Sequence, residues 1–349
     1  MNKKVVVFGG GTGISQLLSG LKLFPVDITA VITVSDDGAS TGKLREEFIM
    51  PGMGDIRKVI VSLSNASDKL KKLFEYRFDT YSDLNGHPIG NLILVGMYNM
   101  TGSLKESIDV LSEFLEVKHK VLPLSEDSLT LVGKTKDGDI VSGEHNITEA
   151  GCQFSKLYYE KEPTITPEVI QSILDADMIV FSVGSLYTSI IPHLISKQVI
   201  KAIDKSSAKI IYVCNAVTQP GETDNFSVSD HVKVLNSYLG KRKIDAVLAA
   251  STKIPNDIVL KYSTKEQKDL VPIDKDNLKD MNCKLYKEDM LVLENNMIRH
   301  DSLKLANLIF DCLMKKWEWY YVFYSWNKKW NFFAFFFYNG RDSWTSGIC

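Results

Sequence analysis

The sequence predicts an α/β fold with a mostly parallel, doubly wound sheet, and three observations support this class. Short apolar runs bounded by small or polar residues recur along the chain, as in strands that are buried on both faces. Segments with apolar residues at helical spacing fill several of the intervals, so that strand alternates with helix. A glycine-rich turn at 9–13 joins the first apolar run to the first helical segment.

These patterns assign the elements in chain order. We expect strands at 5–8, 28–34, 178–183, 209–214 and 246–250, and helices at 56–63, 89–100, 103–115 and 169–174. The segments 120–124, 129–134 and 140–142, with a turn at 136–139, predict a small antiparallel β insertion at about 119–147. One compact domain over residues 1–316 is favoured over two independent ones.

The composition excludes several classes of protein. The 41 basic and 43 acidic residues give a formal net charge of −2, so charge-driven binding of nucleic acid is not expected. The five cysteines are scattered without a Cys-x-x-Cys pair, which indicates a reducing compartment and no thiolate zinc site. Because Met1-Asn2-Lys3-Lys4 leads directly into a short strand, we expect no signal peptide and a cytoplasmic protein.

Residues 317–349 differ from the rest of the chain. They contain all five tryptophans and 15 of the 35 aromatic residues. Asn327-Lys328-Lys329 interrupts the apolar run, so no unbroken span of about 20 apolar residues is present to cross a membrane. A C-terminal interface strand is one interpretation; a frame-error extension is the preferred one.

The turn at 9–13 is a candidate anion site. Glycines let the backbone approach an anion, and the free N–H groups and dipole of a helix N-terminus favour negative charge. Gly10, Gly11, Thr12 and Gly13 are therefore candidate contacts of a phosphate group. The alternative is a turn that requires glycine for its geometry alone.

Polar loops follow three more of the predicted strands, and ligands of such sheets bind beyond the carboxyl ends of strands. The loops contain Asp36 and Asp37, then Gly184 and Ser185, then Asn215 and Thr218. The two aspartates could accept hydrogen bonds from a ribose or hold Mg²⁺ against phosphate oxygens. A solvated turn or a helix cap is the simpler interpretation.

Basic, amide and aromatic residues near these loops complete the candidate site. Lys43 and Arg45 could neutralise phosphate, Arg57 and Asn91 follow two glycine-bearing helix entries, and Tyr262 and Arg299 add a ring and a guanidinium. Two well-known phosphate motifs are absent. Gly38 and Gly42 enclose three residues rather than the four of a P-loop, and Ile14 replaces a glycine of the dinucleotide fingerprint.

Six dispersed motifs, in order over residues 3 to about 314, resemble those of the bacterial gluconeogenesis factor family, relatives of 2-phospho-L-lactate transferase. They are Gly-Gly-Gly-Thr-Gly at 9–13, Ser-Asp-Asp-Gly at 35–38, Gly-Asp-Ile-Arg at 54–57, Gly-His-Pro-Ile-Gly-Asn at 86–91, Asn215, and Thr-Gln-Pro-Gly-Glu-Thr at 218–223. The chain departs from the family pattern at Lys43, where an arginine is usual, so a bidentate phosphate fork is lost there.

The resemblance implies a Rossmann-like three-layer sandwich and a nucleotide-derived ligand. In the bacterial branch this ligand is UDP-N-acetylglucosamine, and the proteins are needed for cell shape and for growth on gluconeogenic carbon sources. The resemblance implies that Gly10–Gly13 hold the diphosphate, that Asp36 and Asp37 lie at the phosphate or a metal, that Asn215 and the Thr218 loop contact the nucleotide, and that Tyr262 and Arg299 contact the sugar-nucleotide end.

Two functions follow as hypotheses. The first is a regulatory protein that binds a UDP-sugar and acts through an unknown protein partner in the control of cell-wall precursors. The second is a Mg²⁺-dependent transferase of the 2-phospho-L-lactate transferase type. No nucleophile–base pair is evident in the sequence, which favours binding over turnover. We expect no tightly bound organic cofactor, no nucleic-acid partner and no membrane span, and a homodimer is the default assembly.

Overall fold

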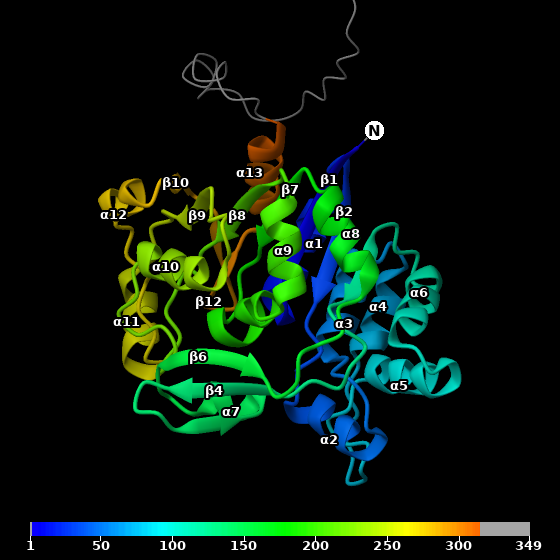
Figure 1. The fold of residues 1–349 in the computed structure, drawn as a ribbon. Coiled ribbons are helices and arrows are strands. Elements are labelled where there is room, and N and C mark those ends of the chain that lie inside the picture. The colour runs from blue at the N-terminus through cyan, green and yellow to red at the C-terminus, as the bar shows by residue number, and fades with distance from the viewer. Residues whose placement is uncertain (1, 315–349) are drawn as a thin grey trace, which may run out of the picture. The chain divides into compact units, whose positions relative to one another are not determined.

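The main sheet determines where the polar loops meet. The computed structural model describes residues 2–314, and a seven-stranded parallel sheet with the strand order β10-β9-β8-β7-β1-β2-β3 forms its centre (Figure 1). The strands are β1 Lys3–Gly9, β2 Val26–Ile32, β3 Lys120–Pro123, β7 Met178–Phe181, β8 Lys209–Val213, β9 Ala246–Ala250 and β10 Lys284–Glu288. The predicted doubly wound, mostly parallel sheet is confirmed. The predicted extension at 317–349 lies outside the described residues.

The strand order reverses beside β1. From β1 the chain adds β2 and β3 on one side, and β7, β8, β9 and β10 follow on the other. Such a reversal leaves a crevice at the carboxyl ends of the two central strands, and ligands of open α/β sheets bind there. The fold therefore singles out the loops that follow β1 and β7.

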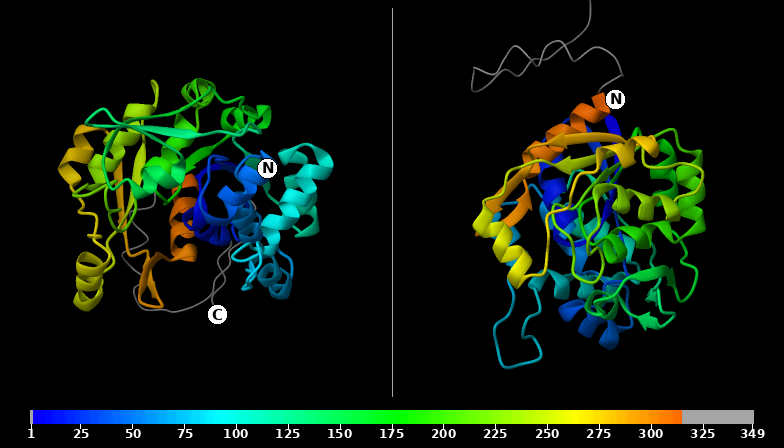
Figure 2. Two further views of the ribbon diagram at one scale, coloured as in Figure 1. Left: turned by 90° about the horizontal axis from the view of Figure 1, so that it is seen from below. Right: turned by 90° about the vertical axis from the view of Figure 1, so that its left-hand side faces the viewer.

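Helices cover both faces of the sheet and produce three layers (Figure 2). One face carries α1 Gly11–Leu21, α3 Gly54–Leu63 and α13 Ser302–Met314, with α4 Asp68–Glu75, α5 Ile89–Thr101 and α6 Leu104–Phe114 beside them. The other face carries α8 Pro167–Asp175, α9 Lys197–Lys205 and α10 Val228–Tyr238, and α12 Lys275–Asp280 packs against α10.

The core explains why the first apolar run is a central strand. Val5–Phe8 are almost completely buried, and Ile14, Leu17 and Leu18 of α1 are buried in the same cluster. A parallel strand with helices on both faces needs such a continuous apolar run. At the other end of α1, a Cβ on Gly20 would lie 2.1 Å from the carbonyl oxygen of Ser302, so glycine permits the close approach of α13.

The small sheet corrects part of the sequence prediction. It consists of β4 Leu131–Thr135, β5 Ile140–Ser142 and β6 Phe154–Tyr159 in the antiparallel order β5-β4-β6. The segment predicted at 120–124 is instead β3, which pairs in parallel with β2 at the edge of the main sheet. Its apolar run fits either environment, because periodicity does not distinguish a hairpin strand from a short buried one.

The insertion lies at the carboxyl edge of the main sheet. In Figure 1, β4, β6 and α7 (Glu144–Glu149) lie below the main sheet, between α2 (Ala39–Phe48) and α11 (Asn256–Lys265). A Cβ on Gly221, in the loop after β8, would be 2.3 Å from the Cα of Gly151, so the two loops are in contact. The small sheet therefore covers the edge at which the polar loops end.

A separate hairpin completes the described chain. It pairs β11 Leu291–Glu294 with β12 Met297–His300, and its Leu291 and Ile298 pack on Ile258 and Tyr262 of α11. Between residues 2 and 314, no helix has both the length and the apolar character needed to cross a membrane.

Candidate functional site

The glycine turn begins α1 and is occupied in part by a carboxylate of the protein itself. The amide of Gly11 donates to Oδ2 of Asp55 at 2.5 Å, and Lys58 forms an ion pair with Oδ1 of the same carboxylate at 2.8 Å. Thr12 and Gly13 supply the next two N–H groups of the first helical turn, which have no acceptor among the described residues. Asp55 therefore already demonstrates that this turn attracts a negatively charged oxygen.

The first turn of α1 lies directly against the loop that follows β7. A Cβ on Gly13 would lie 2.1 Å from the carbonyl oxygen of Val183, so only glycine fits there. The amide of Ser182 also donates to the carbonyl of Phe8 at 2.9 Å, which joins the ends of β1 and β7. The two loops of the crevice are therefore in contact.

Asn215 connects this pair of loops to a third. Its Oδ1 accepts from the amide of Gly184 at 3.1 Å, and its Nδ2 donates to the carbonyl of Gly184 at 2.8 Å. Two bonds between one amide side chain and the backbone of one residue hold the loop after β8 against the loop after β7. The predicted convergence of these loops on one edge is present, and Asn215 positions the backbone of Gly184.

Three carboxylates gather where β2 and β1 end. Asp36 accepts from the amide of Gly38 at 3.1 Å, and its partly buried carboxylate lies close enough to Asp55 for the two charges to interact. Burial and the charge of Asp55 raise the pKa of Asp36. Burial and the charges of Asp36 and Asp55 also raise the pKa of Glu144, at the start of α7, well above its usual range. The cluster holds excess negative charge, with Lys58 as the neighbouring cation.

Sequence reasoning missed Asp55, Lys58 and Glu144 as site residues. The sequence presents Asp55 only as a residue near a helix start, because its acceptor role depends on contact between segments 44 residues apart. Glu144 enters through the insertion, far along the chain. The one signal for Asp55 in the sequence was its place in the Gly-Asp-Ile-Arg motif, directly after the glycines at 52 and 54.

Asp37 and Arg45 have their polar atoms bonded within the protein. Asp37 accepts from the amides of Glu144 at 3.1 Å and His145 at 2.7 Å, so it caps α7 and ties the insertion to the loop after β2. The guanidinium of Arg45 donates to the carbonyls of Ser35, Asp36 and Leu129 at 2.8 to 3.0 Å. Both side chains therefore fix the loop after β2: Asp37 ties it to α7, and Arg45 ties it to the backbone at Leu129.

Lys43, Arg57 and Asn91 lie on the side formed by α2, α3 and α5. Lys43 is exposed, and its charge contributes to lowering the pKa of His87, after the effect of burial. Arg57 is buried and donates from Nε to Oδ1 of Asn91 at 2.9 Å. Arg57 and Asn91 are therefore hydrogen-bonded to each other, which could not be read from their two separate sequence motifs.

Ser185 pairs with a buried glutamate. Its Oγ lies 2.7 and 3.0 Å from the two carboxylate oxygens of Glu222, and it accepts from the amide of Thr188 at 3.0 Å. Burial raises the pKa of Glu222 to about 7. Ser185 also precedes a π-helical turn, Leu186–Ile190, a local distortion that is frequent at functional sites. Glu222 was not predicted, although its Pro-Gly-Glu-Thr loop was.

Thr218, Tyr262 and Arg299 lie beyond Asn215. Thr218 is buried, and its hydroxyl accepts from the amide of Asp269 at 2.9 Å. The hydroxyl of Tyr262 accepts from the amide of Ile298 at 2.8 Å, which joins α11 to β12. Arg299 is partly exposed on β12, with the sulfur of Met297 3.6 Å from Nη2. Of these three, Arg299 keeps a side chain accessible to a ligand.

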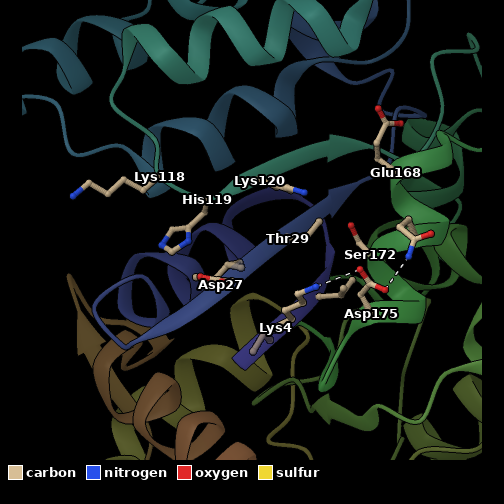
Figure 3. A pocket seen from close by; sticks show the side chains of 13 residues that line it. Lys4, Asp27, Thr29, Lys118, His119, Lys120, Glu168, Ser172 and Asp175 are labelled. Atoms are coloured by element: carbon tan, nitrogen blue, oxygen red, sulfur yellow. Dashed lines mark hydrogen bonds and ion pairs between the residues drawn. The ribbon is translucent and has the colours of Figure 1, made fainter. Parts of the chain in front are cut away.

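A cavity at the opposite, amino edge of the sheet contains none of the predicted site residues (Figure 3). It has a volume of about 270 Å³ and lies at the starts of β1, β2 and β3 beside α8. Its wall carries Lys118, His119 and Lys120 before and at the start of β3 and Glu168 and Asp175 on α8, and Lys4 forms an ion pair with Asp175 at 3.3 Å. Because both signs of charge line the cavity, it does not favour a negatively charged ligand over a positively charged one.

The carboxyl edge combines backbone N–H groups that lack an acceptor among the described residues with carboxylates beside them. Backbone N–H groups and a helix dipole favour an anion at α1, and Asp36 with Asp55 would attract a hard cation next to it. Among residues 2–314, no three His, Cys, Asp or Glu side chains are arranged as a ready-made metal site. Oxygens of a ligand would have to complete any coordination shell.

Known proteins resemble the chain over this whole region. The model of the family described as 2-phospho-L-lactate transferase CofD matches residues 5–291. The gluconeogenesis factor of Bacillus subtilis is 42% identical over 311 residues, covering 89% of this chain and 98% of that protein. The putative gluconeogenesis factor of Thermotoga maritima is 45% identical over 313 residues, with coverages of 88% and 98%.

The fold is shared with a solved structure. The crystal structure of protein BH3568 from Bacillus halodurans superimposes with a TM-score of 0.86 at 40% identity, and the match covers 89% of this chain and all of that one. Both the family model and the relatives span the glycine turn, the carboxylate cluster and the Asn215 loop. The chain therefore belongs to the 2-phospho-L-lactate transferase CofD family.

Proposed function

We propose that this protein is a gluconeogenesis factor: a cytoplasmic regulatory protein that binds UDP-N-acetylglucosamine and is needed for cell shape and for growth on gluconeogenic carbon sources. The names of its relatives support the first part of the proposal. The observation that carries the ligand class is the first turn of α1, whose Gly11 amide already binds a carboxylate oxygen at the reversal of the strand order. A diphosphate offers the same kind of acceptor with more charge.

The diphosphate is proposed to lie over the N–H groups of Thr12 and Gly13. Gly184, positioned by Asn215, forms the facing wall with its backbone. Arg299, on the hairpin beyond that wall, is the proposed contact of the sugar end. Tyr262 supports Arg299 indirectly, because its hydroxyl holds the amide of Ile298, the residue before Arg299.

Magnesium fits this arrangement. The carboxylates of Asp36 and Asp55 are close enough for the charge of Asp55 to raise the pKa of Asp36, and a divalent cation would relieve that repulsion. Mg²⁺ is commonly bound by one or two carboxylates together with phosphate oxygens, so these two residues would hold it beside the diphosphate. The ion would supply neutralisation of phosphate charge. Asp37, which caps α7, is the weaker candidate of the predicted pair.

The second candidate is a Mg²⁺-dependent transferase of the kind named by the family model. The specific observation in its favour is Glu144, a carboxyl group beside Asp36 and Asp55 whose pKa burial and these charges raise well above its usual range. A carboxyl group of that kind is suited to general acid–base chemistry. The regulatory proposal requires binding without consumption of the ligand, and the transferase requires turnover.

Calorimetric titration with UDP-N-acetylglucosamine, with and without Mg²⁺, tests the proposal. We expect binding that Mg²⁺ strengthens, no consumption of the ligand, and loss of the Mg²⁺ effect in Asp36→Asn. Asp37→Asn is the matched control, because it removes a neighbouring charge but is expected to keep the Mg²⁺ response. Failure of the wild type to bind the UDP-sugar would refute the proposal. Consumption of the ligand would favour the transferase.

A further inference from the structure

A buried guanidinium lies beside the carboxylate cluster without an ion-pair partner. Arg57 is 4% exposed, and between residues 2 and 314 no carboxylate forms an ion pair with it. Burial, followed by the charge of Arg77, lowers its pKa, and the charges of Glu75 and Asp55, neither of which forms an ion pair with it, act in the opposite direction. An unpaired buried charge costs several kcal/mol unless another group compensates it, so its presence calls for a function.

The Nε contact of Arg57 begins a chain of hydrogen bonds whose direction is fixed as far as Ser40. Arginine can only donate, so Nε gives its hydrogen to Oδ1 of Asn91, and the Nδ2 of Asn91 donates in turn to Oγ of Ser40 at 3.1 Å. The hydroxyl of Ser40 lies 2.8 Å from Nδ1 of His87, with which it can exchange one hydrogen bond in either direction. Burial, followed by the charge of Lys43, lowers the pKa of His87.

These hydrogen bonds leave the terminal nitrogens of Arg57 as free donors. Among the described residues they have no acceptor, and they are not among the fully enclosed polar atoms that lack a partner. The small exposed surface of Arg57 therefore includes these nitrogens. A Cβ on Gly90 would lie 2.7 Å from Cδ of Arg57, so glycine leaves room for the stem that presents the guanidinium.

We propose that the terminal nitrogens of Arg57 form a subsite for a small oxyanion, a phosphate or carboxylate group carried by a second ligand beside the nucleotide sugar. Two parallel N–H groups of a guanidinium match two oxygens of such a group. Asn91, Ser40 and His87 are positioning residues, because they fix the orientation of Nε. The inference rests on the proposed function, since it assigns a second ligand to the same edge of the sheet.

Asn91→Asp is the sharpest test. The new carboxylate is nearly isosteric with the amide, and it forms an ion pair with Arg57 at the position of the present hydrogen bond to Nε. Every group in this series of hydrogen bonds keeps a partner when Ser40 donates to the new carboxylate and His87 donates from Nδ1 to Ser40. The variant is therefore expected to fold.

Inorganic phosphate is added to the full chain after titration with UDP-N-acetylglucosamine to saturation, so that the turn at Thr12 and Gly13 is already occupied. Its binding to Asn91→Asp, measured by broadening of the ³¹P signal of phosphate, should weaken at least about tenfold. The midpoint of thermal unfolding should not fall.

Arg57→Met provides a second, independent variant, because an unbranched apolar side chain replaces the buried charge without a new partner. It should lose phosphate binding to the same extent as Asn91→Asp, whereas Lys4→Met at the amino edge should bind phosphate like the wild type. Acetate in place of phosphate distinguishes a carboxylate subsite from a phosphate subsite.

Phosphate binding that persists in both Asn91→Asp and Arg57→Met would overturn the inference, and so would a wild type that binds neither oxyanion. UDP-N-acetylglucosamine titrated into the same samples separates this result from the proposed function. Its failure to bind the wild type refutes the proposed function alone, whatever phosphate does.

Discussion

The two edges of the main sheet differ in how they treat charge. At the amino edge, the open cavity of Figure 3 is bordered by half-exposed ion pairs such as Lys4–Asp175. At the carboxyl edge, Arg57 is buried and Asp36 is partly buried, and neither forms an ion pair within the described part of the chain. Exposed ion pairs contribute little to stability, whereas a charge that is buried without a partner costs free energy unless another group compensates it. The comparison teaches that the visible hollow and the unpaired charges lie at opposite edges of the sheet.

The largest expected effect comes from filling the contact between the two crevice loops. Gly13→Ala places a Cβ 2.1 Å from the carbonyl oxygen of Val183, and we expect it to lower the free energy of unfolding by about 3 kcal/mol. Gly96→Ala is the matched control, since no atom lies within 4 Å of its Cβ on α5. It should raise stability by about 0.5 to 1 kcal/mol. Equal effects in chemical denaturation would contradict the close approach.

An effect of at most similar size, which depends on pH, is expected from the buried acid next to Ser185. The pKa of Glu222 is raised from 4.5 to about 7, so the folded state keeps a proton that the unfolded state releases. Stability is therefore lost as pH rises from about 4.5 to about 7, by about 3 kcal/mol at most. Glu222→Gln removes this dependence.

The measurement for Glu222 is the difference in unfolding free energy between the wild type and Glu222→Gln, determined by denaturant titration across this pH range. Taking the difference cancels the contributions of other titrating groups, such as His193 and His300, whose pKa values burial lowers to about 4. A difference that stays constant with pH would show that Glu222 ionises normally.

The smallest effect is expected at the amino edge. Lys4→Met removes the exposed ion pair with Asp175, and we expect a change in the thermal unfolding midpoint near the limit of detection. Binding of UDP-N-acetylglucosamine should equal that of the wild type. A loss of ligand affinity in this variant would mean that the cavity of Figure 3 belongs to the site and that the two edges are not functionally distinct.

The sequence was informative where local chemistry decides structure. The central apolar run at 5–8, the glycine turn after it and the alternation of strand with helix are local signals, and the structure confirms them. The 120–124 strand was misassigned because a short apolar run carries no information about its partner. The sequence also predicted that the polar loops lie together beyond the carboxyl ends of the strands.

Individual roles within the site could not be predicted from sequence. Whether Arg45 faces a ligand or the carbonyls of Ser35 and Leu129 depends on a contact between segments 84 residues apart. The same holds for Asn215, whose amide is bonded to Gly184, and for Asp55, whose partner Gly11 lies 44 residues away. Sequence identifies polar residue types near strand ends, and tertiary contacts decide which of them remain available to a ligand.

Amide hydrogen exchange with and without UDP-N-acetylglucosamine and Mg²⁺ tests the central claim most directly, because it compares both edges in one sample. The account predicts that the ligand slows exchange in peptides containing Thr12 and Gly13 and in those containing Gly184, and leaves peptides from Lys118 to Lys120 unchanged. Protection confined to the Lys118–Lys120 edge, with none at Thr12 and Gly13, would contradict it.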